Sequence, residues 1–472
     1  MLARHGRSQA HEIAGKPLTV SLALALPLLC GLLIAQTSTM GAIVLVAAVA
    51  IPFIALVEGA PLFVFLAIYP ILTPWTFAGV GAEHAMGLLC LVAWGFGVLL
   101  RRQPLQLPSS LASGLILLYF LVSLISIVTM TSANSAYLIR IYVLNAALFV
   151  LAQSCAGTRV GLMRALQALV AGAAMVGLLA LFSFLQGRTI PSQGLERLGL
   201  EGVGVNVFAA VLLLGSGVAL GLAVGEQRKR QLSILWLVGI ALTILIVLSQ
   251  SRGAFVGQLM LVAVGILFGD RGRRRFLVML PMLLVTSLVL AGIGRSGIVG
   301  EYSSRVLDLI SGGEALETAR PHLWEMARQA FVENPLFGVG VGNFTNPTVW
   351  YELATATSAP TWIFPLADAH SFYLSTLAEL GLAGFIPLMG GLLLIVVSVA
   401  RIAWRASTTR LATVSGPAYA LLFGSVAFFT AIAFLPSRTL ALPYVLLGIA
   451  EGFRRMTAND HLPSSGSKAG GM

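Results

Sequence analysis

Long apolar stretches, separated by short polar connections, dominate this sequence and restrict the folds that it can adopt. A helix needs about 20 apolar residues to cross the hydrocarbon core of a bilayer. Charged residues make up 10% of the chain, whereas a soluble domain carries roughly 25%. The sequence therefore predicts an all-α protein, a polytopic bundle of transmembrane helices. The fourteen candidate spans are 18–36, 39–57, 60–74, 85–100, 110–130, 137–155, 165–186, 204–224, 232–249, 254–269, 276–294, 380–400, 416–435 and 439–453.

Lys and Arg residues between these spans fall on alternate connections, as one consistent topology requires. By this assignment 20 of the 29 basic residues lie on one side, which the positive-inside rule makes the cytoplasmic side. Both termini are then expected in the cytoplasm. The net charge of +11 reflects this topology and does not indicate nucleic-acid binding. Because several spans are short, two of them can be half-helices, which leaves twelve crossings as an alternative.

One long connection, residues 295–370, is expected on the outer side. It contains four basic and eight acidic residues. Because it is also rich in Trp, Phe and Leu, we interpret it as a functional loop and not as a disordered one. Within it the sequence predicts a helix from Pro321 to Asn334 and a glycine-rich turn from Gly338. A short helix is expected to lead into the twelfth span near Leu380. The predicted domains are a cytoplasmic tail (1–17), a transmembrane bundle (18–294), the loop domain (295–370), C-terminal transmembrane helices (371–455) and a disordered cytoplasmic tail (456–472).

Histidines that can reach the outer side are candidates for a general base, because imidazole exchanges protons near neutral pH. These are His84, His322 and His370. His370 is the strongest candidate, because it lies where the loop meets the membrane and follows Asp368 closely. A surface or packing role is the alternative for each histidine.

Arginines on the same side are candidates for anion binding, since a guanidinium group pairs with phosphate in a bidentate way. Arg252 lies in a connection of only a few residues, and therefore at the membrane boundary. Arg140 lies in an apolar run near the outer end of a span, and Arg320 precedes the loop helix. The alternatives are snorkelling for Arg252 and Arg140 and a solvated salt bridge for Arg320.

Motifs for nucleotide or metal chemistry are missing from the sequence: there is no Walker motif, Rossmann fingerprint, HExxH or GxSxG. Acidic residues do not cluster at metal-binding spacing, so neither a metal nor a cofactor is expected. Because ATP is absent on the outer face, a lipid-linked phosphate is the substrate class that fits the arginines.

Six segments follow one order and spacing over roughly residues 200–400, nearly half the chain. They are Asn206, Ser251–Gly253, Arg320–Trp324, Asn334–Gly340, Asp368–Leu374 and Glu379–Gly384. Together these segments resemble the bacterial O-antigen ligase and polymerase superfamily, whereas the N-terminal spans match it only in being apolar.

This resemblance implies an inverting, metal-independent glycosyl transfer at the periplasmic face of the bacterial inner membrane. The implied donor is a glycan on undecaprenyl pyrophosphate, and the acceptor hydroxyl belongs to lipid A-core or to a second lipid-linked glycan. His370 would be the base, and Arg252 and Arg320 would bind the pyrophosphate. His322 and Asp368 are secondary candidates for the site, and Arg140 is a secondary candidate for binding the pyrophosphate.

Three other functions compete with an O-antigen ligase that joins the glycan to lipid A-core. The first is an O-antigen or exopolysaccharide polymerase, which joins lipid-linked repeat units. The second is a polysaccharide transporter, which would show mid-membrane charges and broken helices in symmetric halves, neither of which is evident. The third is a membrane scaffold, which would not need arginines and a histidine on one face.

Overall fold

The protein is known from a computed structural model, which describes part of the chain. The predicted spans 18–36 and 276–294, the first part of 39–57 and the predicted boundary between residues 294 and 295 lie outside the described residues. The described residues are 50–72, 76–77, 80–132, 134–188, 190–192, 195–225, 228–268, 319–359, 368–409, 412–435 and 439–460.

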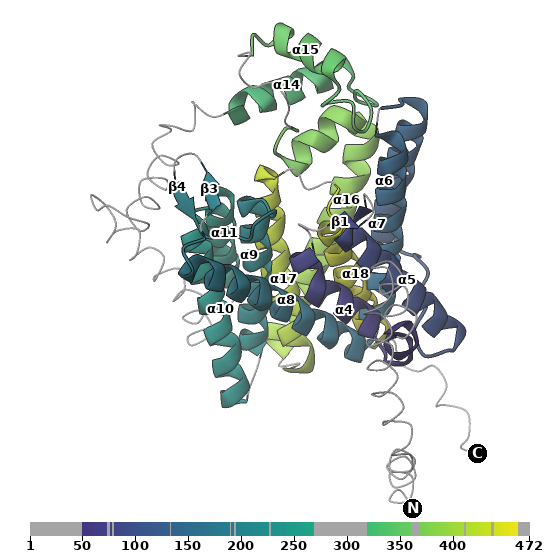
Figure 1. Ribbon diagram of the computed structural model, residues 1–472. Coiled ribbons are helices and arrows are strands. Elements are labelled where there is room, and N and C mark those ends of the chain that lie inside the picture. Colours follow the sequence, from purple (N-terminus) through teal and green to yellow (C-terminus); the bar gives the residue numbers. More distant parts are fainter. Residues whose placement is uncertain are drawn as a thin grey trace, which may run out of the picture.

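Helices make up almost all of the described structure, as predicted (Figure 1). Two short antiparallel hairpins, β1–β2 (Thr76–Phe77, Val80–Gly81) and β3–β4 (Ile190–Ser192, Leu195–Arg197), lie in connections between helices. The helices are α4 (Ala60–Leu72), α5 (Ala82–Leu99), α6 (Leu111–Thr129), α7 (Ser135–Ala156), α8 (Arg159–Leu185), α9 (Val205–Gly225), α10 (Lys229–Ser249), α11 (Arg252–Phe268), α14 (Ala319–Glu333), α15 (Pro347–Ala356), α16 (Phe372–Thr409), α17 (Ala412–Ala431), the 3-10 helix η3 (Ile432–Phe434) and α18 (Leu442–Asp460).

Eight helices among the described residues are long and apolar enough to cross a membrane: α5 to α10, α16 and α17. This confirms the prediction of a polytopic helical membrane protein. α4 and α11 are apolar but shorter, with 13 and 17 residues. α18 continues to Asp460, beyond the predicted start of the C-terminal tail at residue 456.

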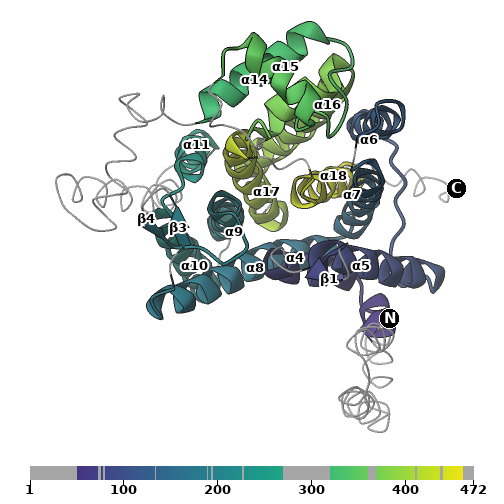
Figure 2. The ribbon, with the colours of Figure 1, turned by 45° about the horizontal axis from the view of Figure 1, so that its top comes forward.

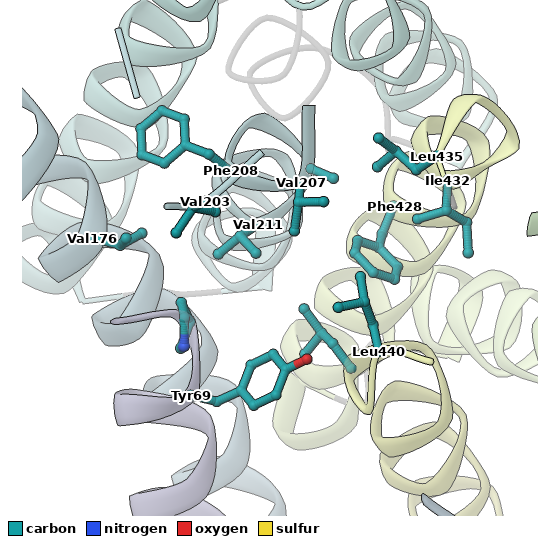
Figure 3. Close-up of a pocket in the computed structure, with 13 residues that line it drawn as sticks. Tyr69, Val176, Val203, Val207, Phe208, Val211, Phe428, Ile432, Leu435 and Leu440 are labelled. Atoms are coloured by element: carbon teal, nitrogen blue, oxygen red, sulfur yellow. The ribbon is translucent and has the colours of Figure 1, made fainter. Parts of the chain in front are cut away.

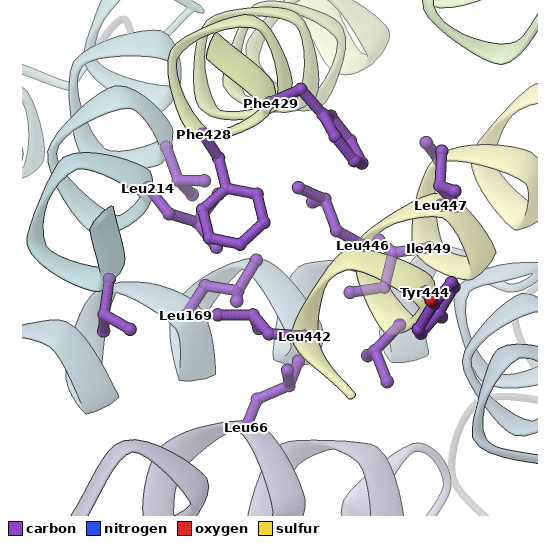
Figure 4. Close-up of a cluster of buried hydrophobic side chains, with 14 of the residues drawn as sticks. Leu66, Leu169, Leu214, Phe428, Phe429, Leu442, Tyr444, Leu446, Leu447 and Ile449 are labelled. Atoms are coloured by element: carbon purple, nitrogen blue, oxygen red, sulfur yellow. The ribbon is translucent and has the colours of Figure 1, made fainter. Parts of the chain in front are cut away.

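The centre of the bundle is formed by α9 and α17, which pack against each other along most of their length (Figure 2). Small residues allow this close approach, as is common between transmembrane helices. A Cβ atom on Gly221 would lie 2.4 Å from the backbone of Ala420, and one on Gly225 would lie 2.2 Å from that of Gly416. Figure 4 shows the neighbouring core, where Phe428 and residues of α18 meet.

Contacts between helix ends show which ends lie on the same side of the bundle. On one side, Arg455 at the end of α18 donates to the Leu107 carbonyl before α6, and Phe268 at the end of α11 packs edge-to-face on Trp404 of α16. On the other side, Asn343 donates to the Met130 carbonyl at the end of α6. We call the side that carries α14 and α15 the loop side.

The loop-side helices have a small apolar core of their own, separate from that of the bundle. α14, α15 and the first turns of α16 lie together above the bundle (Figure 1). Their shared core contains Leu323, Met326, Phe344, Trp350 and Ala378, each at most 2% exposed. The described part of the loop, residues 319–359, is therefore folded. The helix predicted to end at Asn334 is α14, which ends at Glu333.

Candidate functional site

A bend in α16 determines how the loop sits on the bundle. Gly381 has φ 55° and ψ −154°, so the short helix that begins at Phe372 breaks there before the membrane-spanning part continues. A Cβ on Gly381 would lie 2.5 Å from the Leu336 carbonyl carbon, and one on Gly338 (φ +66°) would lie 2.3 Å from that of Glu379. Only glycine tolerates such close backbone contact at positive φ. The backbone of the turn after α14 thus packs directly against the backbone at the bend of α16.

Glu379 fixes the glycine-rich turn from inside the protein. Its carboxylate is 1% exposed and accepts hydrogen bonds from the backbone N–H of Gly342 at 2.9 Å and of Phe344 at 3.3 Å. Its carbonyl oxygen also accepts from the Gly340 N–H at 3.0 Å. A buried carboxylate is stable when N–H groups satisfy it in this way. Sequence reasoning assigned Glu379 no role, although an acidic residue among apolar neighbours near a span is a recognised signal.

The turn between α10 and α11 positions Arg252, the first residue of α11. Arg197 holds this turn, because its Nε donates to the Ser249 carbonyl at 3.0 Å and its Nη2 donates to the Gln250 carbonyl at 3.1 Å. Carbonyls at the end of a helix lack backbone partners, and a cation is favoured there. Arg197, which is 6% exposed, is a second residue that the sequence analysis missed.

His370 lies directly before α16 in a left-handed backbone conformation, with φ 47°. Ser371 caps the helix, since its Oγ accepts a hydrogen bond from the Leu374 N–H at 3.3 Å. Asp368 accepts a hydrogen bond from the Ser375 hydroxyl. Both flanking residues are therefore tied to the first turns of α16, and His370 between them is half-buried.

Four of the predicted residues are brought together electrostatically, although they come from three separate segments. Burial lowers the pKa of Arg320, and the positive charge of Arg252 lowers it further. Burial also lowers the pKa of His370, with Arg320 acting in the same direction and the carboxylate of Asp368 opposing it. The charge of Arg320 thus interacts with those of Arg252 and His370, and His370 interacts with Asp368, on the loop side of the bundle. An imidazole with a lowered pKa is neutral at pH 7 and can accept a proton.

Two predicted residues do not join this group. His322 lies two positions from Arg320 on α14, and such residues point to nearly opposite sides of a helix. Arg140 is exposed on α7, where its Nε donates to the Ala136 carbonyl at 3.2 Å. α7 and α11 lie on different sides of the bundle in both ribbon views (Figures 1 and 2). Among the described residues, no group of His, Cys, Asp and Glu could hold a metal ion.

An apolar pocket lies deeper in the bundle, between α4, α8, α9 and the end of α17 (Figure 3). Tyr69, Phe208, Phe428 and Leu435 are among the residues that line it. Its cavity volume is about 10 Å³, roughly the room that a single water needs. It therefore offers no space for a lipid chain in this conformation.

The fold and the grouped charges define a polytopic helical membrane protein with an arginine- and histidine-containing site on its loop side. Residues 235–389 match the model of the O-antigen ligase family. This part of the chain, about a third of its length, is therefore similar to O-antigen ligases. The matched region includes Arg252, Arg320, Asp368 and His370. A search of curated proteins found no match to the chain.

Proposed function

We propose that this protein transfers a glycan from undecaprenyl pyrophosphate to a hydroxyl of lipid A-core at the periplasmic face of the inner membrane. The single observation that carries the proposal is that the charge of Arg320 interacts with those of Arg252 and His370, all within the matched region. His370 acts as the base, and Arg252 and Arg320 bind the pyrophosphate. A polymerase that joins lipid-linked repeat units uses the same donor and is separated from the ligase by its product.

The two arginines support a pyrophosphate ligand, because like charges held near each other repel. Arg320 is half-buried, and the charge of Arg252 makes its protonated form less favourable. A dianionic or trianionic group between them relieves this repulsion and pairs with both guanidinium forks. Pyrophosphate on a lipid carrier reaches this site because Arg252 begins a helix of the bundle, at the level where the bundle meets the loop.

His370 suits the role of base, because its neutral form predominates at pH 7. In the reaction, the acceptor hydroxyl oxygen attacks the anomeric carbon of the donor sugar from the face opposite the pyrophosphate. The C–O bond to the pyrophosphate breaks, and its electron pair stays on the leaving group. The hydroxyl proton moves to the imidazole of His370. The leaving group is already good, so the enzyme needs mainly positioning, charge neutralisation and one proton acceptor.

The test is genetic complementation with a matched pair of histidine variants. A strain that lacks the gene receives the wild type, His370→Asn or His322→Asn, and its surface polysaccharides are separated on a gel. Asn is chosen because, among residues other than glycine, it tolerates the positive φ of His370 well. His370→Asn is expected to behave like the empty vector, whereas His322→Asn, on the far side of α14, is expected to restore the polymer ladder.

The material that accumulates in the deletion strain distinguishes ligase from polymerase. Long lipid-linked polymer without a ladder on lipid A-core supports the ligase, and single repeat units support the polymerase. If His370→Asn restores the ladder at normal protein level, His370 is not the base. In that case a transport function becomes the better account.

A further inference from the structure

A cavity of about 260 Å³ opens on the side opposite the loop, between the ends of α16, α17 and α18. Its lining includes Arg401 and Arg405 of α16 and Arg454 of α18. Small side chains such as Ala406 and Ala458 leave the space between them open. Three guanidinium groups from two helices therefore border one cavity, far along the spans from the site on the loop side.

Arg454 is held in a fixed orientation at this cavity. Its Nε and Nη2 each donate to a carboxylate oxygen of Glu451 at 2.7 Å. Glu451 is fully buried, and the Ser110 hydroxyl also donates to it at 2.6 Å. This one carboxylate also pairs with Arg455 at 3.3 Å, so it is shared between two arginines. Arg401 is exposed and makes no hydrogen bond or ion pair with any described residue. Arg401 thus brings to the cavity a positive charge that no described residue neutralises.

Aromatic side chains show how deep this cavity lies in the membrane. Trp404, on the same turn of α16 as Arg405, is 57% exposed and meets Phe268 edge-to-face, with ring centroids 6.1 Å apart. Exposed Trp residues at helix ends concentrate at the level of the lipid headgroups. The cavity therefore opens at headgroup level, where phosphate groups are the most abundant anions.

Topology alone does not account for the cavity. The positive-inside rule requires only that basic residues lie near the helix ends. Lys229 and Arg230, exposed at the start of α10, meet that requirement without lining the cavity. We propose that the cavity formed by Arg401, Arg405 and Arg454 binds the phosphate of an anionic membrane lipid. Basic pockets between transmembrane helices on the cytoplasmic side suit such headgroups.

The experiment measures lipid binding to the full-length protein in a neutral detergent. Phosphatidylglycerol, phosphatidylcholine and inorganic phosphate are titrated separately, and the shift of the thermal unfolding midpoint gives each dissociation constant. The variant Arg401→Gln/Arg405→Gln is compared with Lys229→Gln/Arg230→Gln, which removes the same charge outside the cavity. Arg401→Gln alone serves as a further variant, because that side chain has no partner among the described residues to lose.

We expect phosphatidylglycerol to bind the wild type and the α10 control equally. Each basic residue near a membrane surface contributes about 1 kcal/mol of lipid binding. The double cavity variant should therefore bind roughly 30-fold more weakly, and Arg401→Gln about 5-fold more weakly. An equal loss in both double variants would mean diffuse attraction and overturn the proposal. Equal binding of phosphatidylcholine, or equal stabilisation by inorganic phosphate, would also overturn it, the latter by making the cavity a site for soluble anions.

Discussion

The contact between Gly338 and the bend of α16 can be tested by adding one carbon atom. A Cβ at Gly338 would lie 2.3 Å from the Glu379 carbonyl carbon and 2.5 Å from the Ala378 carbonyl oxygen. Both atoms are backbone, so no rotamer change can relieve the clash. Gly187 provides the matched control, because it has a similar positive φ of +76° but would place its Cβ in open space.

Gly338→Ala and Gly187→Ala share the free-energy cost of a left-handed L-residue, and they differ in the cost of a steric clash. An L-residue in the left-handed conformation costs about 1–2 kcal/mol at either position. Only Gly338→Ala adds the cost of overpacking, about 1–3 kcal/mol. We therefore expect Gly338→Ala to weaken its turn by about 2–5 kcal/mol and Gly187→Ala to weaken its own by about 1–2 kcal/mol.

Hydrogen exchange measures these local costs directly, because the Val339 and Gly340 amides donate to α16 at 3.0 Å each. At about 1.4 kcal/mol for each factor of ten, exchange in the Gly338 turn should accelerate roughly 30-fold or more. Exchange at Gly187 should accelerate by roughly 5- to 30-fold in its own variant. Equal acceleration in the two turns would refute the contact. If the contact is real, Gly338→Ala should also reduce glycan transfer, because α14 holds Arg320.

Two further predictions concern the neighbours of the site. Arg197→Gln should lower the thermal unfolding midpoint, since about 1.5–3 kcal/mol is lost for each charged hydrogen bond removed. The control Arg188→Gln, at an exposed arginine, should leave the midpoint unchanged. Equal midpoints for the two variants would contradict the role of Arg197 in capping α10. Asp368→Asn should move the acid side of the pH–rate profile for glycan transfer to lower pH, because the carboxylate raises the pKa of His370. In Arg320→Gln, the acid side of the pH–rate profile of the residual activity should move to higher pH, because Arg320 lowers the pKa of His370. A pH–rate profile that does not move in either variant would exclude His370 as the titrating base.

Hydropathy predicted the spans well where helices face lipid, and less well where polar residues take part in the fold. α18 was predicted to end at residue 453 but runs to Asp460, because the buried Glu451 pairs with Arg454 one turn later and lets the helix continue past the apolar run. α15 was not predicted at all. Its start carries a helix signal, since Asn346 caps it and Pro347 occupies the first helical position.

The residues of the site were predictable from their chemistry, whereas their proximity was not. Arg252 and Arg320 belong to different helices, and nothing in the spacing of either indicates that their charges interact. Their proximity depends on tertiary contacts. Arg197 holds one helix end, and Glu379 holds the turn that follows the other helix. A buried Arg in a hairpin and a buried Glu beside a span become informative only once their backbone partners are known.

Because contacts outside the site hold its helices, the arginines of the site need not stabilise the fold. The apolar core of the loop side and the backbone contacts of Glu379 hold α14 independently of Arg320, so repulsion between Arg320 and Arg252 does not push the helices apart. In the function proposed above, an anion bound near both arginines would offset the unfavourable interaction between their charges. Charges fixed in advance of the ligand need no reorganisation during the reaction, which is the condition under which electrostatic stabilisation of a transition state is most effective. In that proposed reaction, the pyrophosphate leaving group gains negative charge as its bond to the sugar breaks, so two arginines beside it would stabilise the transition state more than the bound substrate.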